Sequence, residues 1–167
     1  QADVQYGGVD QRKILMYARE YLPKAGYKPR VEVMTPLIPG LIGKKMSASD
    51  PKSKIDLLDD EKSVQDKVRS AYCEEGKVED NGVLAFLKLV IMPLKQDRKE
   101  KLFIERPVKF GGNLSFSTYQ EIEDAFVNKK LHPLDLKNSL ATEINALLEL
   151  FRKNKTKLEQ IAMEAYN

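Results

Sequence analysis

Residues 4–34 read VQYGGVDQRKILMYAREYLPKAGYKPRVEVM, and this stretch decides the fold class of the first part of the chain. The run that ends at Gly8 and the run 31–34 have strand composition. Between them, apolar residues recur at helical spacing, so we expect Asp10 to cap a helix that runs to about Tyr21. A strand–helix–strand unit requires a parallel sheet, whose ligands bind beyond the carboxyl ends of the strands.

The next segment, residues 36–55, reads PLIPGLIGKKMSASDPKSKI and is predicted to be a loop, because its prolines and glycines disfavour helix and central strand. Its tip offers the ammonium group of Lys45 and the hydroxyl groups of Ser47 and Ser49. These groups suit a polyphosphate whose charge changes during a reaction. Taken as an isolated pattern, a basic solvated surface loop is the more common interpretation.

Composition narrows the functional classes. The chain has 167 residues, of which 42% are hydrophobic and 32% charged, and no apolar run is long enough to span a bilayer. The single cysteine, Cys73, excludes an internal disulfide and fits a reducing cytosol, which predicts a cytoplasmic protein. A net charge of +3 is too small for general attraction to nucleic acid, so any RNA site depends on local clusters such as Lys129–Lys130.

Beyond the loop the pattern becomes mainly helical, and we place a domain boundary between residues 57 and 58. The expected helices cover about 59–72, started by Asp59 or Asp60, 81–93, started by Asn81, 117–128, started by a Ser117–Gln120 capping box, and 133–151. A terminal helix opened by a Thr156–Glu159 capping box and strands at 102–104 and 114–116 complete the set. The predicted fold class is therefore α/β followed by mainly α with a small β element.

Two constellations are candidates for binding. Gly7 to Gln11 forms a glycine turn with an acceptor carboxylate on Asp10, although such a turn is more often a plain strand–helix connection. Phe110, His132 and Asp135 could stack on and hydrogen-bond an unstacked RNA base. The simpler interpretation is a loop anchor, a helix entry and a first-turn carboxylate. One histidine and one cysteine cannot form a usual zinc site, so no metal ligands are predicted.

Together these motifs resemble the tyrosyl-tRNA synthetases of the archaeal and eukaryotic cytosolic type, which are class I aminoacyl-tRNA synthetases. The run KMSAS at 45–49 is similar to their Lys-Met-Ser-Lys-Ser signature, and GGVDQRK at 7–13 is similar to their nucleotide turn. The runs KFGGNL at 109–114 and LHPLDLKN at 131–138 resemble their anticodon-binding domain. The similarity covers essentially the whole chain.

The resemblance implies roles for particular residues. Gly8 and Asp10 would hold the adenosine ribose, and Gln11 would reach the tyrosine carboxyl group or the adenylate. The loop residues, Lys45, Ser47 and Ser49, would stabilise the pyrophosphate leaving group, with Mg²⁺ accompanying ATP. The anticodon residues, Phe110, His132 and Asp135, would stack on and hydrogen-bond the guanine at the first anticodon position.

By the same resemblance, residues 1–57 would be the C-terminal part of a Rossmann-like catalytic domain and residues 58–167 the anticodon-binding domain. The His-x-Gly-His type motif of the other half does not occur in these residues, so we expect no tyrosyl-adenylate formation by this chain alone. Its partners would be tyrosine, ATP, the tyrosine-accepting tRNA and the N-terminal half, in a homodimer or pseudo-dimer. Two alternatives stay open: a non-catalytic RNA-binding fragment or pseudo-dimer half, and a tryptophan–tRNA ligase.

Overall fold

The computed structural model describes residues 2–42 and 53–166, and it divides the chain into two compact units, Gln1–Leu37 and Ile38–Asn167. This division falls earlier than the 57/58 boundary expected from sequence. The physical reason is Leu41, whose side chain is fully buried in the core of the second unit. The assignment of catalytic and anticodon-binding roles to residues 1–57 and 58–167 stays a prediction.

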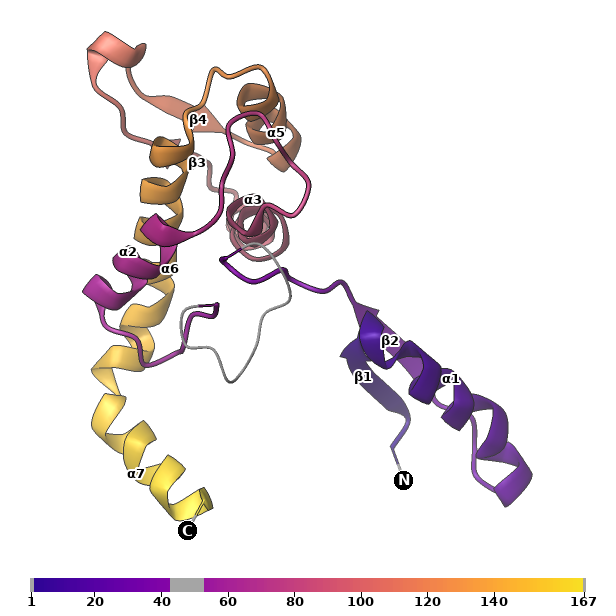
Figure 1. The fold of residues 1–167 in the computed structure, drawn as a ribbon. Coiled ribbons are helices and arrows are strands. Elements are labelled where there is room, and N and C mark those ends of the chain that lie inside the picture. The colour runs from indigo at the N-terminus through magenta and orange to yellow at the C-terminus, as the bar shows by residue number, and fades with distance from the viewer. Residues whose placement is uncertain (1, 43–52, 167) are drawn as a thin grey trace. The chain divides into compact units, whose positions relative to one another are not determined.

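The first unit is a parallel strand–helix–strand motif, as predicted (Figure 1). Its elements are β1 (Val4–Gly8), η1 (Val9–Gln11), α1 (Arg12–Tyr21), η2 (Pro23–Ala25) and β2 (Val31–Thr35). The register runs from Val4 opposite Val31 to Gly8 opposite Thr35, so both strands end at the same edge. The described sheet has these two strands, and a larger Rossmann-like sheet stays a prediction.

The cap predicted at Asp10 is wrong. Asp10 lies inside the 3-10 turn η1, and α1 begins at Arg12 with no side-chain cap from Gln11. The short turn moves the helix start past Asp10, which leaves its carboxylate free of a capping role. The predicted helix end at Tyr21 is confirmed.

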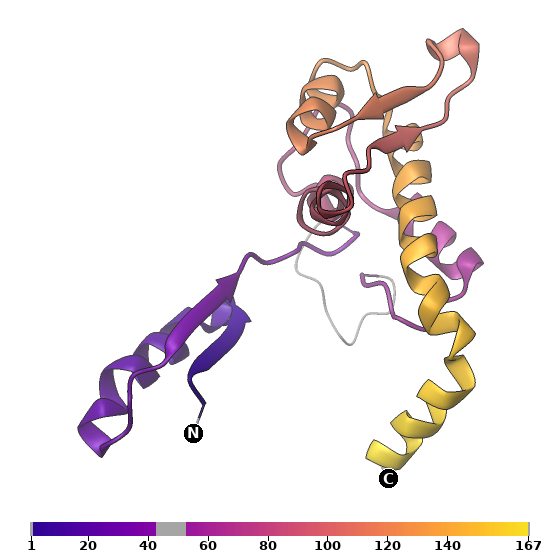
Figure 2. The ribbon, with the colours of Figure 1, turned by 180° about the vertical axis from the view of Figure 1, so that it is seen from behind.

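One face of the β1–β2 sheet is covered by α1 and the other is open (Figure 2). Leu15 of α1 is buried, and a Cβ atom added at Gly7 would lie 3.7 Å from its Cδ1. The open face carries the exposed apolar side chains of the alternate positions, which are Val4, Tyr6, Val31 and Val33. A parallel strand pair is normally covered on both faces, so this open face is an unusual feature of the unit.

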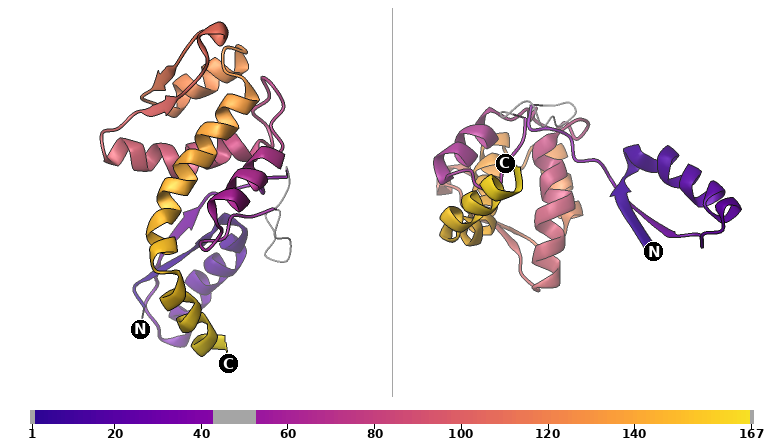
Figure 3. Two further views of the ribbon diagram at one scale, coloured as in Figure 1. Left: turned by 90° about the vertical axis from the view of Figure 1, so that its left-hand side faces the viewer. Right: turned by 90° about the horizontal axis from the view of Figure 1, so that it is seen from below.

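The second unit is mainly helical around a small antiparallel hairpin. Its elements are α2 (Glu61–Ser70), α3 (Gly82–Phe86), the π-helical turn η3 (Leu87–Ile91), α4 (Met92–Asp97), β3 (Leu102–Ile104), η4 (Val108–Phe110), β4 (Leu114–Phe116), α5 (Tyr119–Val127), α6 (Pro133–Lys153) and α7 (Lys155–Tyr166). Figure 3 shows α6 lying along α2 and crossing the continuous rod formed by α3, η3 and α4. The hairpin and the helical class agree with the sequence prediction.

The core of the second unit lies between α6 and the elements that pack on it. Its largest fully buried side chains are Leu41, Leu84, Leu87, Ile91, Met92, Leu102, Ile104, Ile122, Phe126, Leu131, Leu136 and Leu140. They come from every helix of the unit between α3 and α6 and from the hairpin, so burial ties the hairpin to the helices. The hydroxyl of Ser139 on α6 also donates to the carbonyl oxygen of Phe103 on β3 at 3.4 Å.

Helix starts in this unit follow the capping rules. The carboxylate of Asp60 accepts from the Ser63 amide at 2.6 Å, and the Asn81 side chain accepts from the Leu84 amide at 3.1 Å, as predicted. The third cap differs by one residue, because Thr118 forms the capping box with Glu121 in place of Ser117 with Gln120.

Two predicted helix boundaries are wrong. The helix from Asn81 does not stop at Pro93 but runs on to Asp97, because the π-helical turn η3 precedes the proline and relaxes the helix where the proline lacks a donor. The terminal helix begins at Lys155, directly after a break at Asn154, so Thr156 lies inside the helix and is not its cap.

Candidate functional site

A hollow of about 330 Å³ lies where the β3–β4 hairpin meets the N-terminal end of α6. Figure 2 shows these two elements side by side. The residues that line it are Glu75, Arg106, Phe110, Lys129, Lys130, His132, Leu134 and Asp135. The structure therefore brings together Phe110, His132 and Asp135, the three residues that sequence reasoning proposed for base recognition.

Phe110 supplies an accessible aromatic surface. It ends the 3-10 turn η4, and its side chain is 60% exposed. The Lys109 ammonium lies 4.9 Å from its ring centroid, a cation–π arrangement. The next residue, Gly111, has a φ of +97°, a backbone conformation that glycine adopts without a steric penalty and that turns the chain directly after the phenyl ring.

His132 and Asp135 are positioned by the start of α6. The Leu134 amide donates to Nδ1 of His132 at 3.1 Å, so the imidazole caps the helix, and Pro133 occupies the first helical position. An Nδ1 that accepts a hydrogen bond places the proton of a neutral ring on Nε2. His132 is therefore the helix entry that the simpler interpretation expected. Its exposed ring also lines the hollow, so it can contact a ligand as well.

The carboxylate of Asp135 forms an ion pair with Arg106, but its oxygens remain available as hydrogen-bond acceptors. Its Oδ2 lies 4.0 Å from Nη1 of Arg106, which is an ion pair but too long for a hydrogen bond. None of the described residues donates a hydrogen bond to this carboxylate, and its side chain is 18% exposed and lines the hollow. Asp135 can therefore accept hydrogen bonds from a ligand.

The sequence analysis did not identify Arg106. It named Lys129 and Lys130 as a basic cluster but did not assign them to the same site as Phe110. The two lysines lie in the connection between α5 and α6, and Nζ of Lys129 is 3.9 Å from Oε2 of Glu75. Together with Arg106 they give the hollow three cations against two carboxylates, a balance that favours an anionic ligand such as an RNA backbone. No sequence signal marked Arg106, because a single arginine beside Pro107 carries no motif.

The second predicted site is the turn after β1, where Asp10 and Gln11 lie next to each other at the surface. Gln11 Nε2 donates to Oδ2 of Asp10 at 3.3 Å, and both side chains are exposed. A Cβ atom at Gly8 would lie 2.5 Å from Oδ1 of Asp10, so the carboxylate folds closely over the backbone of Gly8. The hydroxyl of Thr35 on β2 donates to the carbonyl oxygen of Gly7 at 3.4 Å, which joins the two strand ends.

The loop residues Lys45, Ser47 and Ser49 lie outside the described residues. The chain on both sides of them belongs to the second unit. The Leu41 amide donates to the carbonyl oxygen of Ser53 at 3.1 Å, and the Tyr72 amide donates to the carbonyl oxygen of Leu41 at 2.7 Å. Leu41 and Ser53 are both buried, so the two flanks are held together beside the end of α2.

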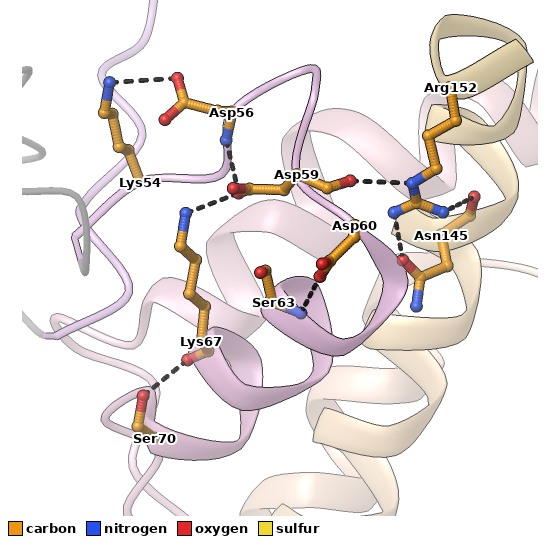
Figure 4. Close-up of polar contacts among 9 residues, drawn as sticks. All are labelled: Lys54, Asp56, Asp59, Asp60, Ser63, Lys67, Ser70, Asn145 and Arg152. Carbon is orange, nitrogen blue, oxygen red and sulfur yellow. Dashed lines mark hydrogen bonds and ion pairs between the residues drawn. The ribbon is translucent and has the colours of Figure 1, made fainter. Parts of the chain in front are cut away.

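A polar network then fixes the segment that leads into α2 (Figure 4). Asp59 is its centre: Oδ2 accepts from the Asp56 amide at 2.9 Å and pairs with Nζ of Lys67 at 2.6 Å. The Arg152 guanidinium on α6 donates to the Asp59 carbonyl oxygen at 2.8 Å and to Oδ1 of Asn145 at 2.6 Å. Both charged side chains of the Asp59–Lys67 pair are mostly buried, so the network pins this segment to α2 and α6.

Other chemistries find little support in the described part of the chain. No group of three or more histidine, cysteine, aspartate or glutamate side chains there could hold a metal ion. Burial raises the pKa of the Cys73 thiol, and the Asn81 amide donates to its sulfur at 3.4 Å. Such a thiol is a weak nucleophile, which agrees with a structural role. No helix in residues 2–42 and 53–166 is long and apolar enough to cross a membrane.

Comparison with known proteins places this geometry in a family. The family model described as "tRNA synthetases class I (W and Y)" matches residues 1–149, and the chain belongs to this family. Its curated relatives include the cytoplasmic tyrosine–tRNA ligase of Saccharomyces cerevisiae, 49% identical over 156 residues, which cover 90% of this chain and 40% of the relative. The cytoplasmic tyrosine–tRNA ligase of Gallus gallus is 45% identical over 98% of this chain and 31% of its own length.

A solved structure agrees in fold. Tyrosyl-tRNA synthetase from Archaeoglobus fulgidus, in complex with L-tyrosine, superposes with a TM-score of 0.83 and 43% identity over 91% of this chain and 46% of its own. The chain thus spans less than half of the length of these relatives. The resemblance to tyrosyl-tRNA synthetases stated from sequence is confirmed.

Proposed function

We propose that this chain is part of a tyrosine–tRNA ligase and that its second unit reads the anticodon of the tyrosine-accepting tRNA. The complete enzyme would join tyrosine to the α-phosphate of ATP, release pyrophosphate and transfer tyrosine to the terminal ribose of the tRNA. Tyrosine is favoured over tryptophan because the relatives at 45–49% identity carry the name tyrosine–tRNA ligase. The alternative is a non-catalytic RNA-binding role of these residues, and the presence or absence of a first half upstream in the gene separates the two.

The observation that carries the proposal is the shared hollow of Phe110, His132 and Asp135. A flipped-out guanine could stack on the exposed phenyl ring and on the imidazole, since aromatic stacking is the common way to hold an unstacked base. The carboxylate of Asp135 could then accept from the N1–H and N2–H₂ donors of guanine, which cytosine cannot present in the same pattern. The neighbouring lysines would meet the RNA backbone.

We assign the nucleotide half of the reaction to the first unit and to the loop that follows it. Gly8 and Asp10 would hold the adenosine ribose, since a carboxylate beside a close glycine backbone suits ribose hydroxyls, and Gln11 would contact the tyrosine carboxyl group or the adenylate. The loop residues, Lys45, Ser47 and Ser49, would stabilise the leaving pyrophosphate. Mg²⁺ would arrive with ATP, and we assign it no ligand from this chain.

The open sheet face supports the Rossmann-like assignment. The exposed side chains Val4, Tyr6, Val31 and Val33 are apolar, whereas a parallel sheet is normally covered on both faces. Further strands and helices of a catalytic domain would cover this face and supply the His-x-Gly-His type motif. On this assignment the 167 residues alone do not exchange pyrophosphate in the presence of tyrosine, and measurable exchange would contradict it.

The decisive test is binding of this chain to the anticodon stem-loop of a tyrosine-accepting tRNA, with guanine or cytosine at the first anticodon position. We expect a guanine preference that Asp135→Ala reduces by ~1–3 kcal/mol, the value of a good base-reading contact. Glu149→Ala is the matched control, because it removes an exposed carboxylate from the same helix at its far end. Equal binding of both stem-loops by the unsubstituted chain would refute the anticodon assignment.

A further inference from the structure

Arg106 is the one residue of the hollow whose charge is almost completely buried, with 8% of its side chain exposed. It follows β3 and begins the connection to β4. A buried guanidinium is costly unless its N–H groups and its charge are matched by the surroundings. The contacts of the Arg106 guanidinium therefore indicate its structural role.

The guanidinium joins three segments. Its Nε donates to the carbonyl oxygen of Gly112 in the hairpin turn at 3.0 Å. Its Nη1 donates to the carbonyl oxygen of Lys130, in the connection between α5 and α6, at 2.8 Å. The same Nη1 lies 4.0 Å from Oδ2 of Asp135 in the first turn of α6.

Each of these segments carries one of the base-recognition residues. The hairpin turn carries Phe110, the α5–α6 connection leads directly into His132, and the first turn of α6 carries Asp135. The backbone amide of Arg106 also donates to Oδ1 of Asn113 at 3.0 Å, which closes the hairpin turn from its other side. One side chain thus sets the spacing between the ring-bearing turn and the carboxylate.

The ion pair with Asp135 has a geometry that suits positioning. At 4.0 Å the charges attract, but neither carboxylate oxygen is occupied by a short hydrogen bond from Arg106. The turn also leaves room for the guanidinium, because a Cβ atom at Gly111 would lie 3.1 Å from Nη2. A lysine could not reproduce this arrangement, since it lacks the planar fork that bonds two carbonyl groups in different directions.

We infer that Arg106 is a positioning residue for base discrimination: it holds the Asp135 carboxylate at the distance from Phe110 and His132 at which a guanine is accepted and a cytosine is not. This inference rests on the proposed anticodon-reading function. It differs from a role in general RNA attraction, which would change the affinity for every RNA and leave the preference for guanine over cytosine unaltered. Arg106 acts through Asp135 and needs no contact with the base.

The test measures the ratio of affinities of this chain for the guanine and cytosine stem-loops. Arg106→Gln should reduce this ratio about tenfold, the same order as Asp135→Ala. In the Asp135→Ala background the same substitution should leave the ratio unchanged, because residues that act as a unit are non-additive. Arg106→Lys keeps the charge and should still lose most of the ratio. Arg98→Gln, which removes an exposed arginine outside the hollow, is the control and should not change it.

The outcomes separate the two proposals. If the unsubstituted chain does not prefer guanine, the anticodon-reading function fails and this inference fails with it. If guanine is preferred and Arg106→Gln weakens both stem-loops equally, Arg106 contributes only charge or fold, and the positioning role is wrong. Thermal unfolding of every variant is measured first. If Arg106→Gln does not fold, Arg106→Lys becomes the test variant, and an unchanged ratio of affinities in Arg106→Lys would overturn the inference.

Discussion

The two units of the chain differ in how they use their apolar side chains. Among the described residues 2–37, Leu15 alone is buried, while the four alternate side chains of the open sheet face are exposed. The second unit encloses a continuous core that reaches from Leu41 to Leu148. The second unit thus has what a domain needs to fold by itself, and the first has the secondary structure of a sheet without its cover.

This difference teaches where each proposed function resides. The hollow around Phe110 is built on a closed core, so its geometry is set within these residues. The turn that carries Asp10 stands on a sheet with one uncovered face. The proposed RNA binding by the second unit can therefore be tested with this chain, whereas the proposed nucleotide chemistry rests on a sheet that is covered on one face only.

The largest expected effect is in the core of the second unit. Phe126 on α5 is fully buried, so Phe126→Ala removes a ring from a packed interior and should lower the free energy of unfolding by about 3–5 kcal/mol. Val127→Ala is the matched control, because the next residue on the same helix is 47% exposed and should change stability by less than about 0.5 kcal/mol. Urea unfolding followed by circular dichroism measures both, and equal effects would contradict a closed core.

A smaller effect, dependent on pH, is expected at the start of α2. The Ser63 amide hydrogen bond lowers the pKa of Asp60 below its usual value of 3.8. A carboxyl group with a lowered folded-state pKa stabilises the fold above its unfolded pKa, and this stability is lost as pH falls through the folded pKa. Asp60→Ala should therefore lower the melting temperature more at about pH 7 than at about pH 3. An effect independent of pH would show that the charge is unimportant.

The smallest effect is expected on the open face of the first unit. Tyr6 is 71% exposed, so Tyr6→Ser should alter the stability of the β1–β2 pair by only about 0.5 kcal/mol or less. Leu15→Ala, on the covered face, should instead abolish much of the hydrogen-exchange protection of the β2 amides. A large loss of protection in Tyr6→Ser would show that the face is already packed in this chain, and the contrast between the units would be wrong.

Local rules predicted much of the fold. The parallel strand pair, the hairpin and the caps at Asp60 and Asn81 followed from periodicity and capping chemistry, which act over a few residues. The helix beyond Pro93 did not, because proline normally ends a helix and here the π-helical turn η3 precedes it. The shift of the capping box to Thr118 did not either, because Ser117 and Thr118 satisfy the same local rule.

The candidate site divides in the same way. Phe110, His132 and Asp135 could be proposed from motif resemblance, and their shared hollow agrees with it. Arg106 could not be found, because its side chain contacts Gly112, Lys130 and Asp135, which lie in segments that no sequence pattern relates. The roles of Lys45, Ser47 and Ser49 stay predictions, since these residues lie outside the described part of the chain.

The packing of α6 on α2 also has a consequence for synthesis on the ribosome. Val64 and Val68 of α2 are fully buried, and Nζ of Lys137 on α6 donates to the carbonyl oxygen of Arg69, 68 residues earlier in the chain. At about 5–20 residues per second, α2 is translated roughly 3–14 seconds before its partner helix. During that interval its apolar stripe has no native cover, so we expect nascent chains that stall before α6 to be bound by chaperones.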